Sequence, residues 1–174
     1  ELLQLHLRDD LSIDLPTYFE IIRRKTAVLV GAAGGLGVRV AGGDDAIAQA
    51  MQAYGEHLGV AFQIRDDILD LEEETATIGK TAGRDLAKGK MTLPAILVLE
   101  EGAPALRREL TTAIQAKDET SVRRIVREAG AIDRAVGLAT EEVTRAKTVI
   151  KAHVTGELGT FFVELADSVL TRTR

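Results

Sequence analysis

Apolar residues recur along most of this chain at the three- to four-residue spacing of amphipathic α-helices, and no two alternating segments are joined by a hairpin turn. The pattern predicts a short first helix and a long helix over residues 16–41, with a proline tolerated in its first turn. A second long helix is predicted from an N-cap at Asp44 to about residue 73. We therefore expect an all-α fold.

One irregular stretch interrupts the helical segments near the middle of the chain. Residues 75–90, "TATIGKTAGRDLAKGK", lack convincing periodicity, and we expect a loop with at most one helical turn. Residues 91–102, "MTLPAILVLEEG", predict a very apolar helix that is central to the core. Three or four further amphipathic helices are expected over residues 103–170, where the charges are those of ordinary helix surfaces.

Composition narrows the class of protein without identifying it. With 174 residues, 45% of them hydrophobic, the chain is long enough for one domain with a sizeable buried core. A net charge of -5 argues against a protein that binds nucleic acid. The lack of cysteine excludes disulfides and thiolate metal sites and fits the cytoplasm. The longest uncharged run, residues 26–38, is too short to span a bilayer, so we expect no stable membrane insertion.

Three aspartates and a glutamine interrupt the apolar pattern near the end of the second long helix, within "FQIRDDILD". At about 100° per residue, Asp66, Asp67 and Asp70 fall within an arc of about 100°, and Gln63 shares that face. Such like charges repel one another by roughly 0.2–0.5 kcal/mol per pair, and a bound cation reverses the sign. Oxygen ligands without nearby His or Cys suit Mg2+. The alternative is an acidic, solvated helix end, extended by residues 72–74.

The stretch after the aspartates carries the opposite charge. A single acid, Asp85, stands there against four cations, which are Lys80, Arg84, Lys88 and Lys90. An acidic face followed by a basic, glycine-rich loop predicts a metal ion with a bound phosphate group. The loop is no P-loop, because five residues separate Gly83 from Gly89 and no strand precedes it. The glycines of residues 31–37 do not fit a dinucleotide fingerprint either, and they predict close helix–helix packing.

Three segments in this order carry a family resemblance: "YFEIIRRKTAVL" at residues 18–29, "FQIRDDILD" at residues 62–70 and "IGKTAGRDLAKGKMTLP" at residues 78–94. Together they resemble the trans-isoprenyl diphosphate synthases, the polyprenyl synthetase family. The resemblance implies a bundle of long, mostly antiparallel helices around a central cavity, usually in a homodimer. It also implies condensation of isopentenyl diphosphate with an allylic diphosphate.

The resemblance assigns roles to particular residues of this chain. "DDILD" resembles the second aspartate-rich motif of the family, which holds Mg2+ against the allylic diphosphate. The implied metal-binding residues are Asp66, Asp67, Asp70 and Asp85, with Asp66 and Asp70 as the direct ligands. The implied diphosphate-binding residues are Lys25, Thr26, Gln63, Lys80 and Lys90. The residues expected to carry catalysis are Lys25, Lys80 and Asp66.

The chain departs from the family pattern because the N-terminal helices, the first aspartate-rich motif and the basic residues for isopentenyl diphosphate are missing. Asp9–Asp10 and Asp44–Asp45 lack the third aspartate of that motif. We therefore expect residues 1–174 to be the C-terminal part of a single polyprenyl synthetase domain that does not complete the reaction alone. A non-catalytic structural or regulatory subunit of a heteromeric synthase is the alternative. A terpene cyclase would need an N-D-x-x-S-x-x-x-E motif, which is not found.

Overall fold

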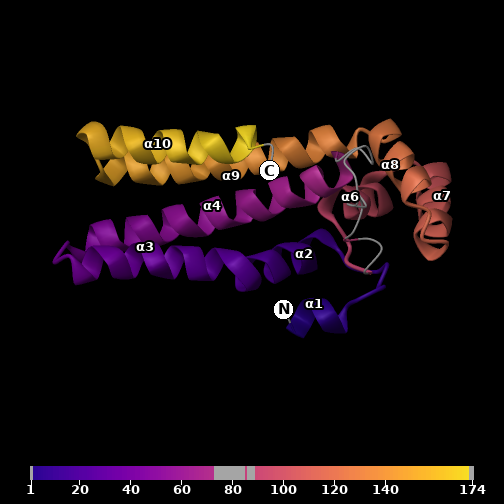
Figure 1. The fold of residues 1–174 in the computed structure, drawn as a ribbon, viewed down its shortest axis with the longest axis horizontal. Helices are drawn as coiled ribbons and strands as arrows, with labels where there is room; N and C mark the ends of the chain where they lie inside the picture. The colour runs from indigo at the N-terminus through magenta and orange to yellow at the C-terminus, as the bar shows by residue number, and fades with distance from the viewer. Residues whose placement is uncertain (1, 73–84, 86–88, 173–174) are drawn as a thin grey trace, which may run out of the picture. The chain divides into compact units, whose positions relative to one another are not determined.

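The computed structural model describes residues 2–72, 85 and 89–172, and these residues form helices without any strand (Figure 1). The N-terminal elements are α1 (Leu2–His6), α2 (Leu15–Ile22), the π-helix η1 (Arg23–Ala27), α3 (Val28–Val40) and α4 (Asp45–Glu72). The later elements are α6 (Leu93–Glu101), α7 (Pro104–Gln115), α8 (Glu119–Glu128), α9 (Ala131–His153) and α10 (Gly156–Thr171). The predicted all-α fold is confirmed for the described residues.

The helix ends follow the signals in the sequence. Asp44 caps α4, because its Oδ1 accepts a hydrogen bond of 2.8 Å from the backbone N–H of Ile47. Asp118 caps α8 in the same way, accepting from the backbone N–H of Ser121 at 3.1 Å. The region predicted to hold three or four helices after residue 103 contains four, α7 to α10. The predicted loop over residues 75–90 lies largely outside the described residues.

The helix predicted as continuous over residues 16–41 is interrupted by the π-helix η1. A π-turn holds one residue more than an α-turn and is common at functional sites. Ala27, the last residue of η1, is fully buried and meets Gly59 of α4, where an added Cβ would lie 2.6 Å from the Ala27 Cα atom. Periodicity alone does not reveal such a turn, because its residues have ordinary helix propensity.

The chain divides into two compact units. Unit 1 comprises Glu1–Ile21 and Asp66–Val136, and unit 2 comprises Ile22–Arg65 and Gly137–Arg174. The long helix α4 contributes residues 45–65 to unit 2 and its aspartate-rich end to unit 1. The predicted metal ligands and the glycines of α3 therefore belong to different units.

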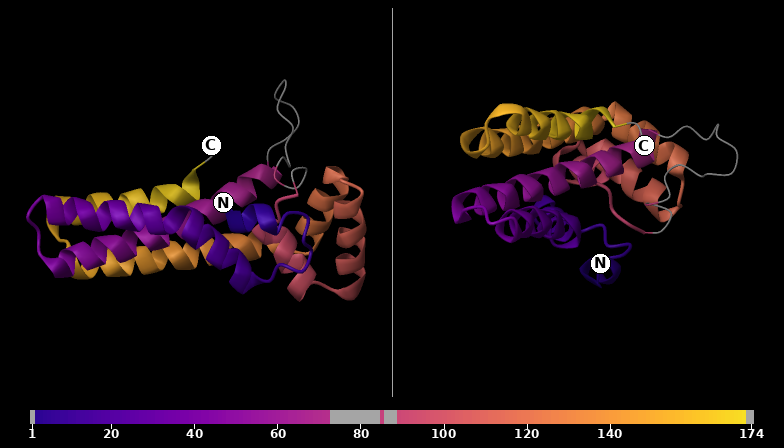
Figure 2. Two further views of the ribbon diagram at one scale, coloured as in Figure 1. Left: turned by 90° about the horizontal axis from the view of Figure 1, so that it is seen from below. Right: turned by 60° about the vertical axis from the view of Figure 1, so that its left-hand side comes forward.

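Unit 2 consists mainly of four long helical segments that lie side by side in pairs, α3 with α4 and α9 with α10 (Figures 1 and 2). Its core joins α4, α9 and α10 through buried side chains, namely Met51, Tyr54, Ala61, Val143, Ala146, Ile150, Ala166 and Val169. The Tyr54 hydroxyl donates a 2.7 Å hydrogen bond to the carbonyl of Phe162. This bond satisfies the polar end of a buried ring, and burial raises the pKa of the Tyr54 hydroxyl to about 12.

Glycines bring α3 against α4 at backbone distance. A Cβ added to Gly31, Gly34 or Gly35 would lie 2.7–3.0 Å from a carbonyl oxygen of α4. Gly37, on the other side of α3, has no atom within 4 Å of such a Cβ. The sequence prediction of close helix packing is confirmed for the first three glycines.

Gly31→Ala in the full-length protein is expected to lower the free energy of unfolding by about 1–3 kcal/mol, because the added methyl group overpacks the α3–α4 contact. Gly37→Ala is the matched control, and it is expected to be neutral or stabilising by up to about 1 kcal/mol, since alanine favours the helix. Urea unfolding followed by circular dichroism measures both. Equal effects of the two substitutions would contradict this packing.

Unit 1 is built around α6. Residues Leu93 to Val98 are all buried, which confirms the prediction of a central apolar helix for this unit. The helices α7 and α8 pack against α6, and α8 places Val122, Ile125 and Val126 in the core. Among the described residues, no helix is long and apolar enough to cross a membrane.

Candidate active site

The centre of the aspartate-rich end of α4 is Asp67, which is 1% exposed. Its Oδ2 accepts hydrogen bonds from the Tyr18 hydroxyl at 2.9 Å and from the backbone N–H of Leu93 at 3.0 Å. Its Oδ1 accepts a hydrogen bond from Lys90 Nζ at 2.7 Å. Leu93 is the first residue of α6, so the positive end of a helix dipole also faces this carboxylate. A buried carboxylate is thus satisfied by donors from three segments.

Lys90 connects Asp67 to Asp85. Its ammonium group donates to both carboxylates, and its side chain is 19% exposed. Burial lowers the pKa of Lys90, but the negative charges of Asp67 and Asp85 outweigh burial and raise the pKa above its ordinary value. Lys90 therefore stays charged.

Asp70 lies one turn after Asp67, next to Asp85. The backbone N–H of Asp85 donates to Asp70 Oδ2 at 3.3 Å. Partial burial raises the pKa of Asp70, and the charge of Asp85 raises it further. Asp70 therefore lies close to a second negative charge at the end of α4.

The other predicted site residues fall into three groups. Asp66 precedes Asp67 on α4 and projects about 40° from Asp70 around the helix axis. Lys25 and Thr26 belong to η1 in unit 2, and Gln63 lies on the part of α4 that belongs to unit 2. Lys80 lies outside the described residues. The structure thus brings Asp67, Asp70, Asp85 and Lys90 together within unit 1.

The carboxylates at the end of α4 fit Mg2+ that is shared with a substrate phosphate. In the described part of the chain, no three His, Cys, Asp or Glu side chains are grouped to hold a metal ion by themselves. Mg2+ does not need such a cage, because it usually keeps several waters and joins one or two carboxylates to substrate phosphates. Asp66 and Asp70 supply hard oxygen atoms of this kind at the end of α4.

Sequence reasoning missed the role of Tyr18. The tyrosine stands in the segment that carries the family resemblance, but nothing in its spacing connects it to an aspartate 49 residues later. Its ring is 2% exposed, and burial together with the charge of Asp67 raises the pKa of the hydroxyl well above its usual value. A hydroxyl that remains protonated can serve permanently as a hydrogen-bond donor. The signal in the sequence was an aromatic residue with a polar end at an apolar position of the helix.

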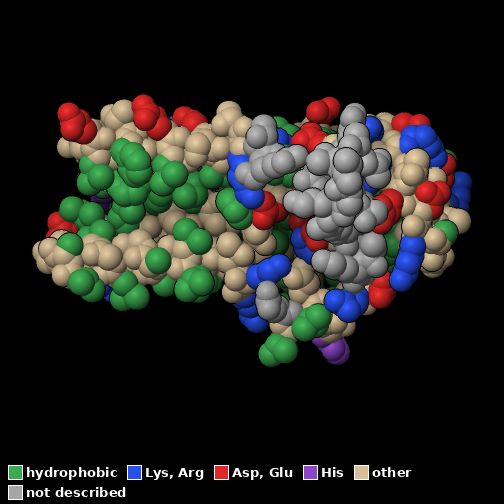
Figure 3. Space-filling view, viewed as in Figure 1, with side chains coloured by type: hydrophobic (Ala, Val, Ile, Leu, Met, Phe, Trp, Pro, Cys, Tyr) green, Lys and Arg blue, Asp and Glu red, His purple; other side chains and the backbone are tan. Residues whose placement is uncertain are grey.

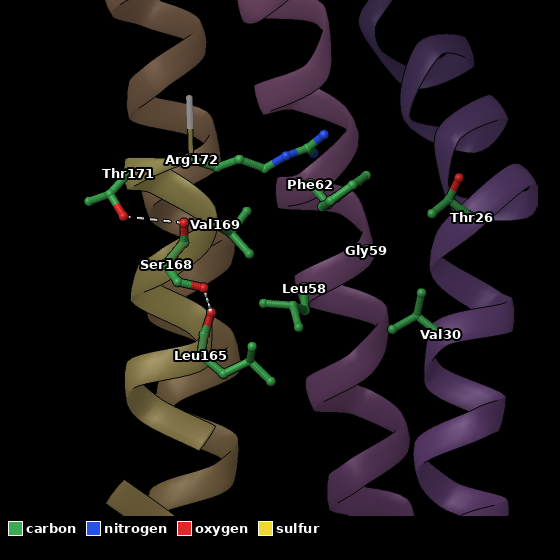
Figure 4. Close-up of a pocket in the computed structure, with 10 residues that line it drawn as sticks. All are labelled: Thr26, Val30, Leu58, Gly59, Phe62, Leu165, Ser168, Val169, Thr171 and Arg172. Atoms are coloured by element: carbon green, nitrogen blue, oxygen red, sulfur yellow. Dashed lines mark hydrogen bonds between the residues drawn. The ribbon is translucent and has the colours of Figure 1, made fainter. Parts of the chain in front are cut away.

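Unit 2 contains a pocket of about 630 Å³ that is lined by η1, α3, α4 and α10, with α4 between α10 and the η1–α3 segment in the close-up (Figure 4). Apolar side chains dominate its lining. In the space-filling view, hydrophobic side chains gather over the part of the molecule that contains α3, α4 and α10 (Figure 3). The lining residues are Thr26, Val30, Leu58, Gly59, Phe62, Leu165, Ser168, Val169, Thr171 and Arg172. The Arg172 guanidinium lies 4.2 Å from the centre of the Phe62 ring (Figure 4). The predicted diphosphate-binding residue Thr26 therefore borders an apolar pocket.

Comparisons with known proteins agree with these features. The sequence matches the polyprenyl synthetase family over residues 1–130. It is 32% identical over 173 residues to a short chain isoprenyl diphosphate synthase from Methanothermobacter thermautotrophicus, covering 98% of this chain and 53% of that protein. It is 40% identical over 97 residues to heptaprenyl diphosphate synthase component 2 from Geobacillus stearothermophilus, covering 55% of this chain and 30% of that protein.

A solved structure extends the likeness to the fold. Polyprenyl synthase from Caulobacter crescentus, complexed with calcium and isoprenyl diphosphate, superposes with a TM-score of 0.89 at 34% identity. The match covers 99% of this chain and 54% of that one, so this chain spans about half the length of such relatives. Its helical bundle is thus of the isoprenoid synthase type. Since the family match includes most of the chain, the chain belongs to the polyprenyl synthetase family, the trans-isoprenyl diphosphate synthases.

Proposed function

We propose that residues 1–174 are the C-terminal part of a single polyprenyl synthetase domain and that the whole protein is a chain-elongating prenyltransferase. Its substrates are isopentenyl diphosphate and an allylic diphosphate. Family membership supports the reaction class. The observation in this chain that carries the proposal is that Asp85 and Lys90 meet Asp67 and Asp70 at the end of α4, because this contact places three carboxylates of the motif residues close together.

Asp66 and Asp70 are the direct Mg2+ ligands in this proposal, and Asp67 and Asp85 act through waters. When bound, Mg2+ neutralises the charge that gathers on the departing diphosphate. Asp67 has little capacity for direct ligation, since its two oxygens already accept three hydrogen bonds from the protein. Asp70 is better suited, because it accepts a long hydrogen bond of 3.3 Å from the N–H of Asp85 and gains from a nearby cation.

Lys90, whose ammonium group contacts Asp67 and Asp85, supports the site through these two carboxylates. Lys25 and Lys80 hold the allylic diphosphate as point charges, supported by Thr26 and Gln63. When the bond between the allylic carbon and the diphosphate oxygen breaks, these donors stabilise the leaving group. The double bond of isopentenyl diphosphate then bonds to the allylic carbon, and a proton lost to the diphosphate restores an alkene. The reaction requires no nucleophilic side chain.

The pocket beside Thr26 supports a prenyl substrate. Val30, Leu58 and Phe62 present apolar surface there, which suits a hydrocarbon chain and excludes water from an allylic cation. We also propose that the whole protein is a cytoplasmic homodimer and that its first aspartate-rich motif stands on the part of the domain that these residues lack.

Incubation of the full-length protein with labelled isopentenyl diphosphate, an allylic diphosphate and Mg2+ tests the proposal. The expected result is an extractable, longer prenyl diphosphate that forms with Mg2+ and is absent with EDTA. Allylic substrates of five to twenty carbons are supplied in separate reactions. Failure of all of them to be elongated would contradict the proposed activity.

A heteromeric synthase is the second candidate, because one relative is named as a component of heptaprenyl diphosphate synthase. In that case the full-length protein would be a non-catalytic structural or regulatory subunit that is inactive alone, and activity would require a second component of the synthase. Activity of the purified, single-component protein decides against this candidate.

A further inference from the structure

The polar contacts of unit 1 form one continuous network from α2 to the candidate metal ligand Asp70. Tyr18 donates to Asp67, Lys90 bridges Asp67 to Asp85, and the Asp85 backbone donates to Asp70. All five residues belong to the same compact unit. Asp67 and Tyr18, at the start of this network, are almost fully buried.

The hydrogen-bond donors divide between the two carboxylate oxygens of Asp67 and so fix its orientation. Tyr18 and the N–H of Leu93 both bind Oδ2 of Asp67, which leaves Oδ1 directed at Lys90. Lys90 in turn fixes Asp85, whose backbone N–H meets Asp70. The Asp67 carboxylate is thus connected through Lys90 and Asp85 to Asp70.

We propose that Tyr18 and Lys90 are positioning residues that act through Asp67 to hold the aspartate-rich end of α4 in a metal-binding geometry. Tyr18 orients the carboxylate, and Lys90 supplies the positive charge that keeps Asp67 and Asp85 together before a metal diphosphate arrives. Lys90 is therefore a structural counter-ion within the site. This inference rests on the proposed function for the identity of the metal-bound ligand, a diphosphate.

Tyr18→Phe tests the inference, because it removes one hydroxyl and preserves the ring. We expect the full-length variant to need about tenfold more Mn2+ for half-saturation in the presence of inorganic pyrophosphate, as measured by electron paramagnetic resonance of free Mn2+. Loss of a hydrogen-bond partner behind a metal-site carboxylate typically weakens metal binding by about 10- to 100-fold. Tyr54→Phe is the matched control, since its hydroxyl also makes one hydrogen bond but in unit 2, and it should bind Mn2+ like the wild type.

Lys90→Met and Lys90→Arg form a second pair of variants. The methionine variant is expected to bind Mn2+ pyrophosphate at least about tenfold more weakly, and the arginine variant to recover part of this loss because it keeps the charge. In turnover assays, Tyr18→Phe should shift the Mg2+ concentration for half-maximal rate, with kcat at saturating Mg2+ within about twofold of wild type. A purely structural role would instead lower kcat at every Mg2+ concentration.

The outcomes separate this inference from the proposed function. Wild-type protein that binds Mn2+ pyrophosphate but elongates no allylic substrate would contradict the activity alone. Tyr18→Phe that binds Mn2+ pyrophosphate like Tyr54→Phe would overturn the positioning role, whether or not the protein is a prenyltransferase.

Discussion

Asp66→Ala in the full-length protein should lower kcat by about a thousandfold or more while the protein remains folded. The variant removes a proposed Mg2+ ligand, and loss of a single electrostatic contact to a developing charge costs about 100- to 1,000-fold even without loss of a metal ion. Steady-state incorporation of labelled isopentenyl diphosphate at saturating Mg2+ measures the change. Asp70→Ala should behave in the same way, because Asp66 and Asp70 project from adjacent turns of α4.

Asp133→Ala is the control for this result. Asp133 is an exposed carboxylate in the first turn of α9, within the same unit as the site, and it contributes only general negative charge. The kcat of the Asp133→Ala variant should stay within about twofold of the wild-type value. Circular dichroism spectra of all variants test whether they are folded. If Asp66→Ala and Asp133→Ala turned over at the same rate, the metal role assigned to the end of α4 would be wrong.

Asp67→Ala is expected to lower the free energy of unfolding by about 3–5 kcal/mol in metal-free buffer, the largest effect on stability anticipated for this chain. The substitution removes the acceptor of the Tyr18 hydroxyl and of the Leu93 N–H. Lys90 loses one of its two carboxylate acceptors and keeps Asp85. Urea unfolding in EDTA measures the loss. The expected order of stability is wild type, then Asp67→Asn, then Asp67→Ala, because asparagine keeps an oxygen acceptor.

Asp70→Asn is expected to have the opposite effect on the free energy of unfolding from Asp67→Ala. The raised pKa of Asp70 means that the folded protein disfavours its charged form, owing to burial and to the neighbouring charge of Asp85. Neutralising Asp70 should therefore leave the metal-free protein as stable as the wild type or more stable. Asp67 would then stabilise the folded protein through its hydrogen bonds. The charged form of Asp70 would instead destabilise the metal-free protein, and a bound cation would remove this cost. Equal destabilisation by Asp67→Asn and Asp70→Asn would contradict this division.

The sequence allowed the helices, their caps and the close α3–α4 contact to be predicted, because these features depend on local spacing. Asp44 is a favoured N-cap residue directly before an apolar-periodic segment, and glycines such as Gly31 and Gly34 within a helical pattern favour the close approach of another backbone. The carboxylate stripe of Asp66 and Asp70 is equally local, since both residues lie on one helix.

The features that escaped prediction depend on contacts between distant segments. Lys90 was counted with the cations of the basic loop, and the sequence did not reveal that its ammonium group contacts the carboxylates of Asp67 and Asp85. Tyr18 gave no sign of its partner because the pairing joins α2 to the end of α4. The π-turn at Arg23–Ala27 escaped for another reason, since the same residues can form an α-turn.

That turn has a consequence for how the chain tolerates changes in length. Removing one residue within Arg23–Ala27 can be absorbed by converting the wide turn into a regular one, which keeps α2 and α3 in register with their neighbours. A deletion a few residues later, inside α3, cannot be absorbed in this way, because α3 has no extra residue in its turns. It would rotate Gly34 and Gly35 by about 100° and drive bulkier side chains into α4.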